Sequence, residues 1–361
     1  MKRMRTIICL LFIISSLNLV AQSLSAYTDY KNYFQVFDNG VTKELEYMPV
    51  QWYKIGGNTV VYLDNANNLK AYYKGEKYLL NEAPPTACFV NDEMVIYLIG
   101  KVMQVFDKGN IIFISGWATD YIIGDSIVGA VDQNAHLYKI YYHGQINSLP
   151  DAIDLASITS FSAGDNLLAY KNMEGFLKVY YRNQVFSTEA SQATQYKSGA
   201  NTVAFVNEST QEFSVFYKGN VTVLESQPPR SFAVADNMVA YVDVNETFKV
   251  FYNGVKTDLT SFTPQFYKAI DNILVYFDNI NLMVFYKGNS YTLDRIIPQE
   301  YKIDKNTFVY QDTQGFPNVF SDGKTAQVYN EKINVYDLSG NTLKYTNSMN
   351  ETRFFVNGKT Y

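Results

Sequence analysis

One short motif recurs ten times along this chain at an almost constant spacing. Each copy ends with a strongly apolar run followed by a turn that closes on glycine or asparagine. The closing residues are Gly40, Gly75, Gly109, Gly144, Asn183, Gly219, Gly254, Gly288, Gly323 and Gly358. The period is about 35 residues, and the longest step, 39 residues, separates Gly144 from Asn183. Such a repeat predicts one array with a continuous core rather than several unrelated domains.

Three further positions recur inside each copy and predict its strands. An aromatic residue opens the copy, an asparagine follows five residues later and a second aromatic residue four after that, as in Tyr267, Asn272 and Tyr276. We call these the first aromatic, the asparagine and the second aromatic stations. The runs between them alternate like strands, and Asn, Asp and Gly tolerate the positive φ of tight turns. Prolines gather between copies, where no ladder hydrogen bond is needed. Each copy therefore predicts a four-stranded antiparallel meander followed by a crossover.

The amino-acid composition is typical of a protein built from β-strands, and it excludes one class of binding partner. The chain has 31 Tyr and 24 Phe but only 2 Trp, and aromatic residues favour pleated, half-buried surfaces. Charged residues make up 18% and form no run of one sign, so the basic footprint of a nucleic-acid-binding protein is absent from the sequence. We expect an all-β protein that binds no nucleic acid.

Four short strands cannot bury both faces of a small sheet, so neighbouring copies must supply the burial. Radial stacking of such meanders gives a β-propeller. The pattern resembles the TolB-like and WD40-like propellers in its strand lengths and in its glycine turn, although it lacks the Gly-His and Trp-Asp signatures of WD40 repeats. This resemblance implies an architecture and carries no activity. We therefore predict an all-β β-propeller of about ten short four-stranded repeats.

The closure of the predicted ring stays open at this point. The first copy starts at residues 24–29 with what matches a second strand, whereas the last copy is complete and stops at Tyr361. One wide ring, an incompletely closed ring and two smaller propellers all fit. The stretch 149–160 accounts for the longest step, and it predicts a loop insertion or, alternatively, a seam between domains.

The N-terminus predicts export. Lys2, Arg3 and Arg5 precede an apolar run that is short for a membrane span, and small or polar residues follow from Ala21. We predict a signal peptide over residues 1–21 and a repeat domain over residues 22–361. Removal of the three positive charges changes the formal net charge from −5 to −8. We expect a protein of the periplasm, the outer cell surface or the medium, without a membrane span once the signal is removed.

An acid or amide follows the asparagine station by six residues in nearly every copy. The acids are Asp29, Asp64, Asp132, Asp243, Asp278 and Asp312, and the amides are Asn172, Asn207 and Asn347. Equivalent loops of a propeller open on one face, so these side chains are predicted to form a ring. They could offer a shared ligand surface, or they could end the second strand by hydrogen bonding their own backbone. No copy has the closely spaced oxygen ligands of a calcium loop.

Other reactive residues are few. Cys88 replaces an aromatic station residue and is expected to be a small buried hydrophobe, while His136 and His143 lie an odd number of residues apart and are expected at the surface. The sequence offers no recognisable metal or cofactor motif. Lysines beside the first aromatic station are expected to face solvent, namely Lys54, Lys197, Lys268 and Lys302.

The uniformity of the copies favours an exported, non-enzymatic module that binds or scaffolds a protein or cell-envelope partner, through the predicted ring or the 149–160 stretch. The alternative is a propeller enzyme, a hydrolase or lyase, whose active site is assembled from several blades in the central channel. Its candidate residues would be the four lysines together with Asp271 and Asp304. A sugar-binding surface built from tyrosines is disfavoured, because most tyrosines occupy stations that a core would use.

Overall fold

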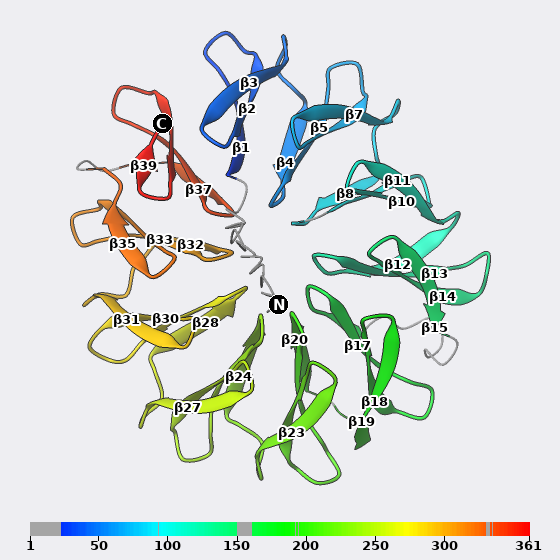
Figure 1. Cartoon of the computed structure of the whole chain (residues 1–361), viewed down its shortest axis with the longest axis vertical. Coiled ribbons are helices and arrows are strands. Elements are labelled where there is room, and N and C mark those ends of the chain that lie inside the picture. The colour runs from blue at the N-terminus through cyan, green and yellow to red at the C-terminus, as the bar shows by residue number, and fades with distance from the viewer. Residues whose placement is uncertain are drawn as a thin grey trace, which may run out of the picture.

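The computed structural model of this chain describes residues 23–92, 94–149, 161–191, 193, 195–329, 333 and 335–361. Ten antiparallel sheets stand around a central axis like the blades of a propeller (Figure 1). The predicted signal peptide lies outside the described residues, as does the stretch 149–160 apart from Leu149. Within the described residues, no helix is long and apolar enough to span a membrane.

The first blade contains three strands and the other nine contain four, each in chain order across the sheet. The first blade consists of β1 (Leu24–Thr28), β2 (Phe34–Asp38) and β3 (Val41–Glu46). The second to fifth blades consist of β4 (Trp52–Ile55), β5 (Thr59–Leu63), β6 (Leu69–Tyr73), β7 (Glu76–Asn81); β8 (Ala87–Val90), β9 (Met94–Ile99), β10 (Val102–Asp107), β11 (Asn110–Ser115); β12 (Ala118–Ile123), β13 (Ile127–Asp132), β14 (Leu137–Tyr142), β15 (Gln145–Leu149); β16 (Phe161–Ala163), β17 (Leu167–Lys171), β18 (Phe176–Tyr181), β19 (Gln184–Ser191). The sixth to tenth blades consist of β20 (Tyr196–Gly199), β21 (Thr202–Val206), β22 (Phe213–Tyr217), β23 (Asn220–Glu225); β24 (Ser231–Ala235), β25 (Met238–Val242), β26 (Phe248–Tyr252), β27 (Val255–Thr260); β28 (Phe266–Ile270), β29 (Ile273–Phe277), β30 (Leu282–Tyr286), β31 (Asn289–Asp294); β32 (Tyr301–Asp304), β33 (Thr307–Gln311), β34 (Pro317–Ser321), β35 (Lys324–Gln327); β36 (Tyr336–Ser339), β37 (Thr342–Thr346), β38 (Thr352–Val356), β39 (Lys359–Thr360).

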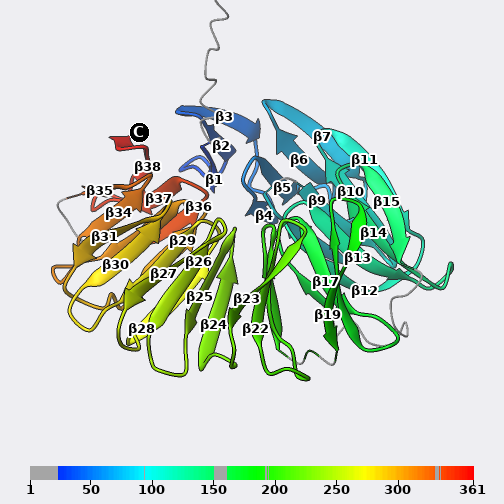
Figure 2. The ribbon, with the colours of Figure 1, turned by 60° about the horizontal axis from the view of Figure 1, so that its bottom comes forward.

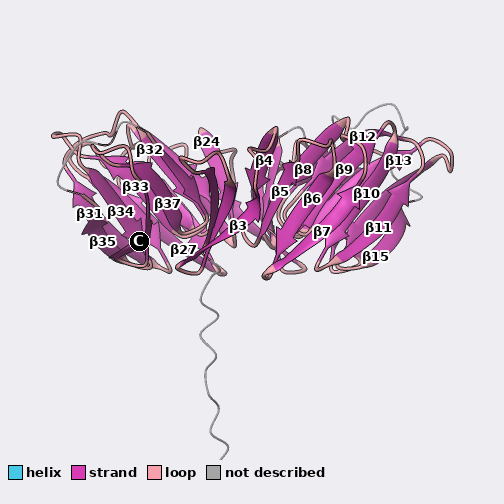
Figure 3. Ribbon diagram, turned by 90° about the horizontal axis from the view of Figure 1, so that it is seen from above, coloured by secondary structure: helices cyan, strands magenta, loops and turns pink. Residues whose placement is uncertain are grey.

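The four strands of a complete blade are called A to D from the axis outward, so β1, β2 and β3 are strands B, C and D of the first blade. Because the strands alternate in direction, the A–B and C–D turns lie on one face of the ring, which we call the glycine face. The B–C turns and the crossovers lie on the other, which we call the aspartate face. Figures 2 and 3 show the strands running between these two layers of loops.

The ring is single and closes on itself. The first blade's β1 contacts β37 of the tenth blade on one side and β4 of the second blade on the other. Phe37 of β2 stacks on Phe354 of β38, with ring centroids 4.3 Å apart, and both side chains are buried. The prediction of about ten repeats is therefore confirmed. The alternatives of two smaller propellers and of an incompletely closed ring are wrong, because aromatic packing between the first and last blades joins the two ends.

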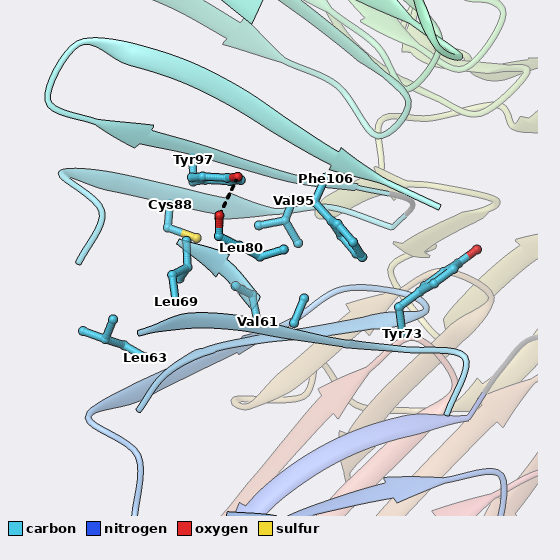
Figure 4. Close-up of a cluster of buried hydrophobic side chains, with 10 residues drawn as sticks. Val61, Leu63, Leu69, Tyr73, Leu80, Cys88, Val95, Tyr97 and Phe106 are labelled. Atoms are coloured by element: carbon cyan, nitrogen blue, oxygen red, sulfur yellow. Dashed lines mark hydrogen bonds between the residues drawn. The ribbon is translucent and has the colours of Figure 1, made fainter. Parts of the chain in front are cut away.

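The core lies between the blades rather than within one sheet. At the interface of the second and third blades, Val61 and Leu69 pack with Val95 and Tyr97, and the Tyr97 hydroxyl donates to the Leu80 carbonyl at 3.2 Å (Figure 4). Successive side chains of a strand point to opposite faces of the sheet, and each face packs against a different neighbouring blade. Every blade therefore needs both of its neighbours to bury its apolar side chains. A continuous core around the ring follows from this packing.

Cys88 belongs to the same buried cluster and is 7% exposed (Figure 4). Burial raises the pKa of its thiol to about 12. A thiol that stays protonated at neutral pH is a poor nucleophile. Its expected role as a small hydrophobe in place of an aromatic residue is thus supported by its surroundings.

The C–D turns explain the glycine that closes each copy. In the seventh blade, Asn253 and Gly254 both have positive φ, 49° and 89°. Two-residue hairpin turns with positive φ at both positions match the twist of the strands that they connect. Glycine adopts the positive φ of the second position without a steric cost.

Candidate functional site

The six aspartates predicted to form a ring all begin B–C turns on the aspartate face. In each, one carboxylate oxygen accepts hydrogen bonds from two backbone N–H groups of the following turn. For Asp64 these come from Ala66 and Asn68, both at 2.8 Å, and for Asp243 from Asn245 and Thr247, both at 2.9 Å. The same pairs of bonds are formed at Asp29, Asp132, Asp278 and Asp312. All six aspartates therefore hydrogen bond the backbone of their own B–C turns, which is one of the two roles expected from the sequence. The other role, ligand binding, stays a prediction.

The second oxygen of three of these aspartates forms an ion pair within the blade. Asp64 pairs with Lys70 at 2.8 Å, Asp132 with Lys139 at 2.6 Å and Asp243 with Lys249 at 2.8 Å. Burial raises the pKa of Asp64, but hydrogen bonds from Lys70 and Asn68 outweigh this effect and lower the pKa to about 2. These carboxylates are ionised at neutral pH and already bonded, so they are poorly suited to proton transfer.

The turns that these residues cap present apolar side chains to solvent. Tyr30, next to Asp29, is 89% exposed, and Met349, two residues after Asn347, is 69% exposed. The Asn347 side chain accepts from the Met349 and Glu351 backbone N–H groups, as the aspartates do in their turns. The polar residue thus holds the turn while its neighbour points outward. Sequence reasoning named the polar residues and missed the apolar ones beside them.

A second set of carboxylates gathers at the axis, on the A–B turns of the glycine face. It comprises Asp125, Asp165, Asp236, Asp271 and Asp304, of which only the last two were considered from the sequence. Asp125, Asp165 and Asp271 each offer an oxygen within 4.8 Å of the others. A repeated aspartate directly before the asparagine station, at Asp125, Asp165, Asp236 and Asp271, was the signal that could have revealed the cluster.

Backbone contacts between successive A–B turns bring these residues together. The Asp236 N–H donates to the Asp271 carbonyl at 2.7 Å, and the Lys305 N–H donates to the Asp271 carboxylate at 2.7 Å. Gly124 permits the same approach elsewhere, since a Cβ there would overlap the carbonyl oxygen of Gly164. The A–B turns therefore lie so close together around the axis that their aspartate side chains form a cluster.

The surroundings of two carboxyl groups in this axial cluster favour their protonated form. Burial, and then the charge of Asp236, raises the pKa of Asp165 to about 9 and that of Asp271 to about 7. Burial lowers the pKa of Lys305, which pairs with Asp92 of the third blade, to about 8. Carboxylate oxygens are ligands for hard divalent cations, but a carboxyl group that holds its proton at neutral pH is a weak one.

The lysines beside the first aromatic station link neighbouring blades. Lys54 donates to the Cys88 carbonyl at 2.6 Å, Lys197 to the Phe232 carbonyl at 2.8 Å, and Lys302 pairs with Asp337 at 2.8 Å. Lys268 lies 5.6 Å from the ring centre of Tyr301. The expectation that these lysines face solvent is correct for Lys54, Lys197 and Lys268, which are exposed, whereas Lys302 is half-buried. All four also contact the next blade.

His136 and His143 lie in turns with positive φ, 52° and 45°. Both are exposed. The expectation of surface histidines is therefore met, and neither is placed at the axis.

Three pockets follow one another on the aspartate face of the last blades. One of about 450 Å³ includes Ile297 and Asp312, the next of about 450 Å³ includes Tyr301 and Val335, and the third of about 390 Å³ lies between the tenth and first blades. Tyr27, Tyr336, Asp337, Lys344, Tyr345 and Thr352 line this third pocket. No residue of it was singled out from the sequence as a candidate for binding.

Comparison with solved structures finds distant likenesses. A computationally designed protein, Ika8, is 17% identical, with 75% of this chain and 96% of that chain covered and a TM-score of 0.36. The CRINKLY WD40 ectodomain of the receptor kinase ACR4 from Arabidopsis thaliana is 8% identical, with 66% and 98% covered and a TM-score of 0.36. PorZ, a surface component of the type-IX secretion system of Porphyromonas gingivalis, is 10% identical, with 92% and 56% covered and a TM-score of 0.27. At these scores the likenesses carry no argument about function.

The search of curated proteins finds no match to this chain. The sequence does match the model of the 10-bladed beta propeller domain over residues 18–361. That span covers all ten blades described above, including the three-stranded first blade. The chain belongs to the family of ten-bladed β-propeller domains.

Proposed function

We propose that this propeller is an exported, non-enzymatic binding module that holds a protein partner on the aspartate face of its eighth, ninth, tenth and first blades. The observation that carries the proposal is a run of exposed apolar side chains across these consecutive blades, which we call the apolar arc. It consists of Ile280, Ile297, Val335, Met349, Tyr30, Tyr47 and Met48.

Two further features support this choice of face. The three pockets described above lie within the same blades and share members with the arc, such as Ile297 and Val335. Single exposed apolar residues are common on protein surfaces, whereas apolar residues gathered beside concave sites mark interaction surfaces. Tyr and Met are also enriched at the centre of protein interfaces. Export of the module is supported by the basic and then apolar N-terminal sequence.

A pulldown with the purified mature protein tests the proposal directly. The bait is exposed to a solubilised bacterial envelope fraction, and Met349→Asp combined with Tyr30→Asp is compared with the wild type. Met173→Asp is a matched control, because Met173 is 71% exposed on the same face but in the fifth blade, outside the arc. We expect a partner at stoichiometric yield with the wild type and the control, and its loss with the double variant. Recovery of that partner by the double variant contradicts the proposal.

One observation keeps an enzyme as the second candidate. Asp165 and Asp271 have raised pKa values near the axis, and a carboxyl group that is protonated at neutral pH can act as a general acid. A hydrolase or lyase of this kind would lose its activity when Asp271 is replaced by Asn. Such an activity, found on a panel of ester, glycoside and uronide substrates and abolished by this change, would favour the enzyme over the binding module.

A further inference from the structure

The interface between the tenth and first blades differs from the nine others in one structural respect. Elsewhere, strand A brings an aromatic residue or Cys88 against the preceding blade. The ring centroids of Phe34 and Tyr53 are 5.2 Å apart, and those of Phe248 and Tyr267 are 4.9 Å apart. In the described part of the first blade the innermost strand is β1, a strand B, so no equivalent ring reaches the tenth blade.

The 390 Å³ pocket occupies the place of that ring. Thr352, in its lining, stands six residues before Gly358, as Phe34 and Phe248 stand six residues before Gly40 and Gly254. In those blades the phenylalanine packs against the strand A ring of the next blade. We call the pocket the vacant socket, lined by Tyr27, Tyr336, Asp337, Lys344, Tyr345 and Thr352.

Three polar residues stand at this interface in positions where the other copies are apolar. Lys344 stands three residues after its asparagine station, where the complete blades have buried Val61, Ile96, Gly129, Ala169, Ala204, Ala240, Val275 and Val309. Ser25 stands at the preceding position of the first blade, where the others have Val, Leu or Phe. Thr352 replaces a buried apolar residue of strand C. The sequence is therefore polar where a strand A is missing from the described first blade.

Lys344 reaches across the space that a strand A would fill. Its ammonium group donates to the Ala26 carbonyl at 3.0 Å and to the Tyr53 hydroxyl, in the second blade, at 3.2 Å. Lys54 and Lys197 make the same bond to a carbonyl of the next blade, but from strand A to strand A. At the seam the bond runs from strand B to strand B, so β1 takes the place of the innermost strand.

The inner edge of β1 is oriented to accept another strand. The Ser23 carbonyl accepts from the Asn39 N–H at 2.8 Å, which shows that the odd-numbered residues bond toward β2. Leu24, Ala26 and Thr28 therefore direct their backbone groups toward the axis, as the Ala26 carbonyl confirms by its bond to Lys344. An extended polypeptide can pair with such an edge by β-augmentation.

We propose that the vacant socket receives an extended strand of a partner polypeptide, which pairs with the inner edge of β1 and places an aromatic side chain against Thr352. Two residues later, this strand carries an acidic side chain that pairs with Lys344. The proposal rests on the proposed function, since it assumes a polypeptide partner.

The nine complete interfaces and the charge of Lys344 identify the occupant. The first aromatic station and the residue two after it face the preceding blade, as Tyr53 and Ile55 do in their cluster with Ala26. At the vacant socket the residue that meets the second of these positions is Lys344 rather than an aliphatic one, which favours a carboxylate there.

The test uses a fluorescent peptide with the sequence of residues 265–272, which contains β28, and with Ala269→Asp. Fluorescence anisotropy with the purified mature protein should give saturable binding. Tyr267→Ala in the peptide should weaken it at least about tenfold, as expected for loss of a buried aromatic anchor. Binding should also slow amide exchange at Leu24, Ala26 and Thr28. Absence of saturable binding, or binding without this protection, overturns the proposal.

Variants of the protein locate the peptide. Thr352→Trp fills the socket and should weaken binding at least about tenfold, and Lys344→Ala should remove the preference for Asp over Ala at position 269 of the peptide. Lys197→Ala is the matched control, because it removes the same kind of lysine–carbonyl bond at a complete interface. Equal effects of Lys344→Ala and Lys197→Ala contradict the proposal. If the envelope partner is lost with the apolar arc variant but retained with Thr352→Trp, the binding module stands and the strand site is wrong.

Discussion

The interface between the seventh and eighth blades and the interface between the tenth and first blades use the same repeat in two ways. In the former, Phe248, Val250 and Leu274 are fully buried and Tyr267 of strand A covers them. In the latter, the outer part is aromatic, with Phe37 on Phe354, but the inner part holds Lys344 and Thr352. The comparison indicates that the positions facing the next blade are apolar where its strand A covers them. At the seam, where the described residues include no strand A, the corresponding side chains are polar.

The largest expected effect separates the two interfaces by stability. Phe248→Ala should lower the free energy of unfolding by about 3–5 kcal/mol, because it leaves a cavity in a filled interface. Thr352→Ala, at the equivalent position of the tenth blade, should change it by less than about 0.5 kcal/mol. Urea unfolding followed by tyrosine fluorescence measures both. Equal losses in the two variants would show that the seam is packed like any other interface.

The aromatic outer part of the seam should matter more than its polar inner part. Phe354→Ala removes the stacked partner of Phe37 and should cost about 3 kcal/mol. Because this contact joins the two ends of the chain, hydrogen exchange should accelerate first in β1–β3 and β36–β39. Uniform acceleration around the whole ring would mean that closure does not depend on this pair.

The axial cluster predicts a smaller effect that depends on pH. The pKa of Asp165 is raised in the folded protein, so the folded state binds a proton that the unfolded state releases above about pH 4. The folded state is therefore not penalised by Asp165 below about pH 4, and it loses stability as the pH rises from there toward 9. Asp165→Asn should therefore raise the Tm by at least about 2 °C at pH 8 and leave it nearly unchanged at pH 4. A scan of Tm against pH for the two proteins checks this, and a gain that is equal at both pH values contradicts it.

The smallest effect concerns the polar lining itself. Lys344→Met replaces the ammonium group with an apolar side chain of similar length, and it should change the free energy of unfolding by less than about 1 kcal/mol. The matched change Val275→Lys, at the same station of the eighth blade, should cost at least about 3 kcal/mol, since it buries a charge without a partner. Thermal unfolding of both variants measures the difference, and tolerance of Val275→Lys would remove the contrast between the interfaces.

Much of this contrast could be read from the sequence, and part of it could not. The stations fixed the strands, and residues 24–29 showed that the first copy starts with its second strand. Ser25, Lys344 and Thr352 could have been found as departures from the repeat, had the copies been compared at those positions. Ring closure through Phe37 and Phe354, and the meeting of Asp125, Asp165 and Asp271 at the axis, depend on the angle between blades, which no local pattern encodes.

Amide hydrogen exchange at Ala26 and Ala240 in the free protein tests the central claim most directly. Both residues stand at the same station of a strand B, but Ala240 pairs with Ala233 of β24, whereas the described first blade has no strand on that side of Ala26. We predict that the Ala26 amide exchanges at least about a hundredfold faster than the Ala240 amide. Equal protection of the two amides would show that the inner edge of β1 is already covered, and it would contradict the account of an open seam.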